Sequence, residues 1–184
     1  HYKTLWSKTD MSNLRLINQT VSDTSVASVN VTDVFSSDYD IYKITVTDIE
    51  VAGDSYQNMR FINSSGSVVS ASSYDDAGLG VYSFTSFGEF KATNSSEFKY
   101  LNYVYPAGYD DGNGITLYVF NPFDTSSYTF ILYQSEGFAN GLGNYMFKSI
   151  GVLKQTSSIT GFSLFKTGNI DNIKIRTYGL RVDS

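Results

Sequence analysis

The stretch Ser158-Ile-Thr-Gly-Phe-Ser-Leu-Phe-Lys-Thr-Gly-Asn-Ile-Asp-Asn-Ile-Lys-Ile-Arg-Thr-Tyr-Gly-Leu180 decides the fold class. Its side chains alternate with a period of two in each half, which is typical of half-buried antiparallel strands. We predict two strands joined at a Gly168-Asn169 turn. The inward set in the second half is Ile173, Ile175 and Thr177, and the outward set, facing solvent or a partner, is Lys174, Arg176 and Tyr178.

Composition extends this prediction to the whole chain. Fifteen Tyr and thirteen Phe favour pleated strands, and the charged fraction of 17% is low for exposed helices. Further strands are predicted at 26–35, 40–50, 57–62, 67–70, 81–90, 98–105, 115–120, 128–134, 145–153, 159–165 and 170–182. The segment 115–120 is apolar on both faces, which indicates a central strand. The fold class is therefore all-β, an antiparallel two-sheet β-sandwich that is jelly-roll-like.

The domain prediction places an extended N-terminal arm before the sandwich. A chain of 184 residues is most simply one domain. Residues 1–25 have thin periodicity, so we expect a docking arm there and the sandwich over 26–184. Two alternatives remain for the first ten residues: the natural start lies at Met11, or Leu5 and Trp6 anchor the arm on a neighbour.

Charge and residue choice exclude several function classes. The net charge is −5 and no Lys/Arg cluster forms, so we expect neither nucleic-acid binding nor, without an apolar run of 18 residues, membrane insertion. The chain has no cysteine, and its single histidine is His1. An internal Ser-His-Asp triad and a multi-histidine zinc site are excluded within one chain. The longer acids (Glu50, Glu89, Glu97 and Glu136) show no spacing of a glycosidase pair, so we expect no enzyme and no catalytic residues.

Two acidic segments are candidate cation sites. Asp110-Asp111-Gly112-Asn113-Gly114 offers the oxygens that Ca²⁺ prefers, and Asp75-Asp76 offers fewer. Asp-Gly and Asn-Gly pairs are also the favoured residues of β-turns. The turn is the preferred interpretation of both segments, so we predict no metal and no cofactor.

Two aromatic groups are candidate sugar-binding platforms, because a pyranose ring stacks on an aromatic face. One comprises Tyr103, Tyr105 and Tyr109, and the other comprises Phe120, Phe123 and Tyr128. Most aromatic residues of an all-β chain fill its core instead. The sequence therefore fixes no ligand-binding residue.

Several segments, in their order along the chain, carry a resemblance to a known family. They are Phe35-Ser-Ser-Asp-Tyr-Asp-Ile-Tyr42, Met59-Arg-Phe-Ile-Asn63, Asn121-Pro122, Ile159-Thr-Gly-Phe162, Gly168-Asn-Ile170 and Ile175-Arg-Thr-Tyr-Gly-Leu180. Together, over roughly residues 28–182, they resemble the small jelly-roll or β-sandwich virion proteins of tailed bacteriophages.

The resemblance implies a non-enzymatic structural or decorating protein on the particle surface: a capsid decoration, a head fibre, or a tail or tail-fibre component. Its partners would be other virion proteins and copies of itself, in the manner of a homo-oligomer, after assembly in the host cytoplasm. The family supplies no catalytic, metal or cofactor residues. The alternative is a carbohydrate-binding β-sandwich module that recognises a host surface glycan.

Overall fold

A computed structural model describes residues 13–106, 113–139 and 143–180, and these residues are all-β. They form eleven strands: β1 (Leu14–Ser22), β2 (Val26–Val31), β3 (Ile41–Val51), β4 (Ser55–Asn63), β5 (Tyr74–Tyr82), β6 (Gly88–Ser95), β7 (Phe98–Val104), β8 (Gly114–Phe120), β9 (Thr129–Ala139), β10 (Gly143–Leu153) and β11 (Ile159–Leu180). Every strand pairing is antiparallel. Over the described ranges there is no helix, and hence none suited to crossing a membrane.

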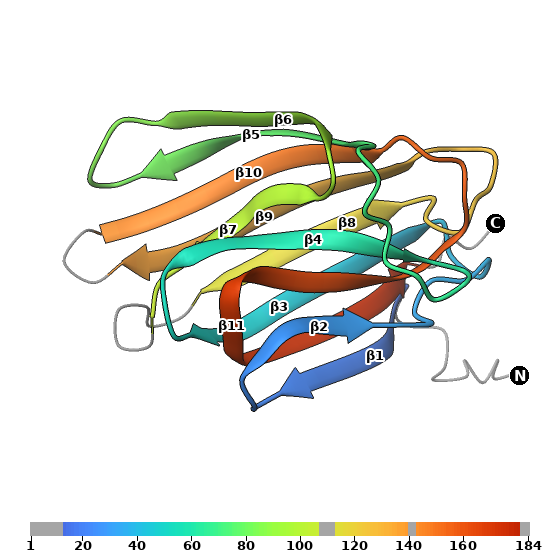
Figure 1. Ribbon diagram of the computed structural model, residues 1–184, viewed down its shortest axis with the longest axis horizontal. Coiled ribbons are helices and arrows are strands. Elements are labelled where there is room, and N and C mark those ends of the chain that lie inside the picture. Colours follow the sequence, from blue (N-terminus) through green and yellow to red (C-terminus); the bar gives the residue numbers. More distant parts are fainter. Residues whose placement is uncertain (1–12, 107–112, 140–142, 181–184) are drawn as a thin grey trace, which may run out of the picture.

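The strands form a sandwich of two layers that share β11 (Figure 1). The larger layer has the order β6-β5-β10-β9-β8-β3, followed by the second half of β11 and then β1. The smaller layer has the order β7-β4, followed by the first half of β11 and then β2. The predicted antiparallel sandwich is confirmed, and so is the central position of 115–120, because β8 lies between β9 and β3.

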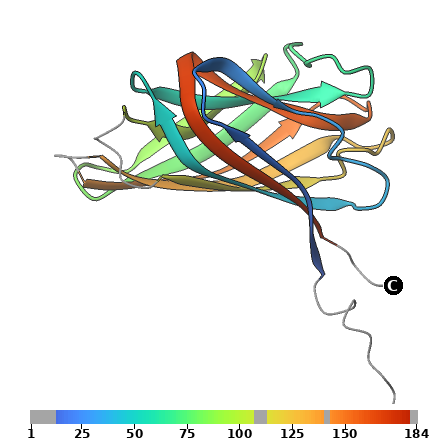
Figure 2. The ribbon, with the colours of Figure 1, turned by 90° about the horizontal axis from the view of Figure 1, so that it is seen from below.

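Strand β11 passes from one layer to the other, and Figure 2 shows it as the long red ribbon that curves between them. Residues Ile159–Phe165 pair with β4, whereas Ile170–Leu180 pair with β3. The predicted terminal hairpin is therefore wrong, because the two halves pair with different strands and not with each other. The predicted turn at Gly168, where φ is +86°, is instead the bend of one continuous strand.

The bend resets the side-chain alternation along β11. Phe162 and Leu164 face the core in the first half, and Ile173 and Ile175 do so in the second. Even and odd positions exchange roles because the register shifts twice between Ile170 and Lys174. Asp48 of β3 lies opposite this shift and has a φ of +56°. It forms an ion pair with Lys174, whose Nζ lies 2.8 Å from Oδ2. A bulge that skips one residue produces this kind of bend in a ladder.

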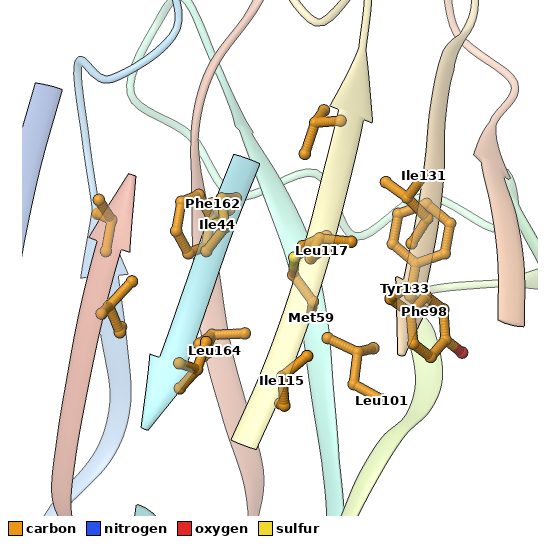
Figure 3. Packing of buried hydrophobic residues seen from close by; sticks show 14 of the residues in the cluster. Ile44, Met59, Phe98, Leu101, Ile115, Leu117, Ile131, Tyr133, Phe162 and Leu164 are labelled. Carbon is orange, nitrogen blue, oxygen red and sulfur yellow. The ribbon is translucent and has the colours of Figure 1, made fainter. Parts of the chain in front are cut away.

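The core lies between the two layers and is made of the inward residues of both (Figure 3). Ile44, Leu117, Ile131 and Tyr133 come from the larger layer. Met59, Phe98, Leu101, Phe162 and Leu164 come from the smaller one. Each is almost fully buried, and the predicted inward residues Ile173, Ile175 and Thr177 are buried as well.

Three segment predictions differ from the structure. The predicted arm 1–25 includes β1, which pairs along Leu14–Ser22 with β11 and so belongs to the sheet; residues 1–12 lie outside the described residues. The predicted strand 81–90 is the end of β5, a turn and the start of β6. The predicted strand 67–70 contributes a single bridge between Ile62 and Val68. In the first two cases a polar or glycine-rich strand is defined by its paired neighbour and not by its own pattern.

Gly161 lies where the backbone of β11 passes very close to the backbone of β2. A Cβ at this position would collide with the backbone oxygen of Val31, and a backbone atom cannot rotate away. We expect Gly161→Ala to lower the free energy of unfolding by about 2–3 kcal/mol, the cost of overpacking a close contact. Urea denaturation measures this.

Gly53→Ala is the matched control, because nothing lies within 4 Å of a Cβ built there. It should change the free energy of unfolding by less than about 0.5 kcal/mol. Equal stabilities of the two variants would contradict the proposed close approach of β2.

Candidate functional site

The outer face of the larger layer carries two neighbouring rows of mostly apolar side chains. The strand register defines them. One row is Asp75, Val152, Phe130, Phe120, Ile41, Leu180 and Leu14, and the next is Ala77, Ile150, Leu132, Tyr118, Lys43, Tyr178 and Leu16. We call the members of both rows other than Asp75 and Lys43 the apolar band. It crosses the layer from β5 to β1.

Much of this band is open to solvent. Ile150 is 62% exposed, Phe130 46% and Leu132 39%. Their strand neighbours Ile131 and Tyr133 point into the core and are buried. The strands β8, β9 and β10 are therefore apolar on both faces, although within the described residues another layer covers only their inner face. A single exposed apolar residue needs no explanation, but a contiguous patch marks an interaction surface.

The band has hollows on both sides of Ile150 and on both sides of Leu132. A groove of about 570 Å³ lies between Phe120 and Phe130 on one side and Ala92 and Thr93 on the other. Ile150 borders this groove and also a second hollow of about 500 Å³ next to Leu79. Leu132 borders the groove and also a third hollow of about 310 Å³. The surface therefore alternates apolar ridges with depressions large enough for a side chain.

Charged side chains flank the band. Lys154 pairs with Asp75 at 2.9 Å, and the pKa of Asp75 is lowered by its hydrogen bonds, first from Lys154 and then from the Asn94 backbone N–H. Lys91, Lys148, Glu89 and Glu136 are exposed on the same face. Both signs of charge thus occur around one apolar surface.

The candidate cation pair Asp75-Asp76 is divided between two faces of β5. Asp75 points outward, whereas Asp76 points into the core and is 4% exposed. Burial raises the pKa of Asp76 to about 7, although its Oδ2 accepts the Lys99 backbone N–H at 3.2 Å. Oδ1 has no hydrogen-bond partner among the described residues. Because adjacent strand residues face opposite ways, the two carboxylates cannot bind one ion together.

The loop at 110–114 is described only in part, since Asp110, Asp111 and Gly112 lie outside the described residues. Asn113 is buried, and its Nδ2 donates to the backbone oxygen of Ile49 at 3.0 Å. Gly114 begins β8. Within the described ranges, no three acids, histidines or cysteines form a group that could hold a metal ion.

The first predicted aromatic platform is part of a larger cluster at the edge formed by β4, β6 and β7. Tyr103 packs edge-on against Tyr105, with ring centroids 4.9 Å apart, while Tyr109 lies outside the described residues. Tyr56, which the sequence analysis did not single out, contacts Tyr100 at 4.6 Å and Tyr103 at 4.8 Å.

Tyr100 is held in an unusual backbone conformation within this cluster. Its φ of +61° is rare for an aromatic residue, and it lies where the register between β4 and β7 shifts. The bulge turns its ring against Tyr56 and Phe90. The hydroxyl of Tyr103 donates to Asp54 Oδ2, which places a carboxylate beside the rings. Strain of this kind occurs most often at functional sites.

The structure does not bring the second predicted platform together. Phe120 belongs to the apolar band, whereas Phe123 lines a separate polar hollow with Ser36 and Asp40. Tyr128 is exposed in the turn before β9. The residues that sequence reasoning missed are Phe130, Leu132 and Ile150. Their one available signal was the apolar character of both faces of β9 and β10.

Among the longer acids, Glu97 is already paired, and Glu89 and Glu136 are far apart. Burial raises the pKa of Glu97, but hydrogen bonds from Ser96 and Arg60 outweigh it and leave the pKa below its usual range. The Glu97 Oε2 accepts from Arg60 at 2.7 Å. Glu89 and Glu136 share the outer face, yet β5 and β10 lie between their strands, a separation of about 14 Å at the backbone. A glycosidase pair requires carboxyl groups about 5–10 Å apart.

Comparison with known proteins gives no family. No family model and no curated protein matches the chain. A fructofuranosidase from Schwanniomyces occidentalis in complex with fructosylnystose aligns at 11% identity and a TM-score of 0.29, over 90% of this chain and 34% of that one. A non-specific endo-β-1,3(4)-glucanase of family GH16 aligns at 9% identity and a TM-score of 0.25, over 84% and 63%.

A viral structure is also among the neighbours. The infectious bursal disease virus Gx strain aligns at 12% identity and a TM-score of 0.15, over 91% of this chain and 39% of that one. The chain thus spans less than two thirds of each of these proteins. At such TM-scores these likenesses carry no argument about function.

Asp76 should make stability depend on pH. Its pKa is about 7 in the folded state, compared with about 3.9 in an unfolded chain. The folded state therefore binds the proton more tightly, and the stabilisation is fully present below pH 4 and is lost as the pH rises through 7. We expect the free energy of unfolding to fall by on the order of 3 kcal/mol between pH 5 and 8.

Denaturant titrations at several pH values measure this, and Asp76→Asn should flatten the profile. Asp75→Asn on the same strand is the control. Because the pKa of Asp75 is lowered, that variant should keep the wild-type slope in this window. A slope that survived in Asp76→Asn would show that another group is responsible.

Proposed function

We propose that the chain is a non-enzymatic structural or decorating component of a tailed-phage virion. In this proposal it is exposed on the particle surface and docks on other virion proteins or on copies of itself. The observation that carries the proposal is the apolar band, a continuous exposed surface on the outer face of the larger layer. The largest apolar patch of a protein often has a function, and proteins built into an assembly cover such a patch.

The arrangement of the polar residues supports a binding role over a catalytic one. Asp76 is the described acid whose pKa is raised toward neutrality, and it points into the core. Glu89 and Glu136 are too far apart to act on one glycosidic bond. The resemblance of the sequence to small virion proteins of tailed phages points in the same direction.

Immunogold electron microscopy of purified virions tests the proposal. Antibodies raised against the chain should label intact particles of the phage that encodes it, at repeated positions on the head, tail or fibres. Mass spectrometry of the same particles should detect the chain in several copies. Its absence from purified virions, with the chain present in the lysate, would refute a structural role.

A second candidate function is recognition of a carbohydrate by the aromatic cluster around Tyr56 and Tyr100. The strained backbone of Tyr100 and the carboxylate of Asp54 beside Tyr103 favour it. Tyrosine rings offer faces for a pyranose, and Asp54 offers an acceptor for its hydroxyl groups.

A glycan array tests this second candidate. If it holds, the chain should bind a defined set of glycans, and Tyr56→Ala should weaken that binding by ~10-fold or more, the loss expected from removing one stacking ring. Phe87→Ala is the matched control, because Phe87 is 72% exposed in the turn between β5 and β6 and outside the cluster's ring contacts. Equal loss in both variants, or no glycan bound, would refute it.

A further inference from the structure

We propose that the partner covering the apolar band is a second copy of this chain, in a two-fold symmetric dimer whose larger layers pack face to face. The inference rests on the proposed function, because it names the partner of the surface proposed there. A closed dimer of this type uses the same patch on both copies, so the patch must be complementary to itself.

The relief of the band meets this requirement. Ile150 and Leu132 form ridges, and each ridge has a hollow on either side. When the face meets a second copy, the ridges of one copy can enter the hollows of the other. The groove of about 570 Å³ is large enough to take an isoleucine or a leucine side chain together with part of its neighbour. Two sheets that pack face to face interdigitate side chains in this manner.

The band and the polar rows beside it are together large enough for a dimer. The band spans seven neighbouring strands from β5 to β1, which is about 29 Å at ~4.8 Å per spacing. Two rows with their side chains cover about 14 Å along the strands, so each copy contributes ~400 Å². The band alone then buries about 800 Å² in total, and the adjacent polar rows bring the interface above the roughly 1,000 Å² of a specific complex.

The flanking charges are also complementary to a second copy. Lys91 and Lys148 are accompanied on this face by Glu89 and Glu136, and none of the four takes part in an ion pair within the described residues. A face with charges of one sign would repel its copy. Because this face carries both signs around an apolar centre, a second copy can place acids opposite bases at the rim.

Sedimentation velocity on the wild-type chain, from about 1 to 200 µM, tests the inference. We expect a species of twice the 20.4 kDa chain mass that gains population with concentration. Ile150→Glu should weaken the dimer by ~100-fold or more, because symmetry buries the unpaired charge twice. Phe130→Ser, which removes bulk without adding charge, should weaken it less. Near-UV circular dichroism checks that each variant is folded.

Phe87→Glu is the control, since it adds the same charge at an exposed aromatic position outside the band. It should leave the dimer intact. A wild-type chain that stays monomeric at 200 µM, or a dimer that survives both Ile150→Glu and Phe130→Ser, would overturn the inference. If the chain is present on virions but sediments as a monomer, this inference alone is refuted. If the chain sediments as a dimer but is absent from virions, the proposed function alone is refuted.

Discussion

The structure depends on one strand that belongs to both layers. β11 pairs with β4 in its first half and with β3 in its second, so its bend fixes the spacing and the relative orientation of the two sheets. The bend requires a residue at positive φ, which Gly168 supplies, and a shift of register that exchanges inward and outward positions. Phe162 and Ile175, one on each side of the bend, are both buried in the same core.

The strands beside β11 adapt to the same bend. β1 and β2 follow its two halves in succession, and the register of β1 shifts between Leu16 and Asn18. β3 is bulged at Asp48, where Lys174 closes an ion pair across the ladder. The pair is partly exposed and contributes little energy by itself. The bulges therefore follow from the geometry of the curve and not from any one contact.

The local sequence pattern predicts those strands in which apolar and polar residues alternate. Residues 41–51 and 170–180 alternate because one side is buried, and both were recognised as strands. The pairing partners could not be derived in this way, since period two is the same for a hairpin and for a strand shared between layers. β1 and β6 were missed for the opposite reason: their residues are polar or exposed on most positions, and they become strands by pairing with β11 and β5.

The candidate site was hidden from the sequence for a related physical reason. Apolar residues on both faces of a strand indicate that both faces are buried. The inner face of β9 is buried, as Ile131 and Tyr133 show. For Phe130, Leu132 and Ile150, no layer formed by the described residues covers the outer face. Sequence alone cannot distinguish a face buried by the same chain from a face buried by a partner. Only the three-dimensional structure shows that the outer residues of β9 are exposed while its inner residues are buried.

The two candidate surfaces lie at different places on the sandwich, and this decides how they relate to each other. The apolar band covers the outside of the larger layer, whereas Tyr56 and Tyr100 lie on β4 and β7 of the smaller layer. A second copy packed on the band would leave the rings of Tyr56 and Tyr100 uncovered. Assembly and glycan recognition would therefore use different surfaces. A dimer would present two aromatic clusters, and on a particle this arrangement would multiply weak individual contacts by avidity.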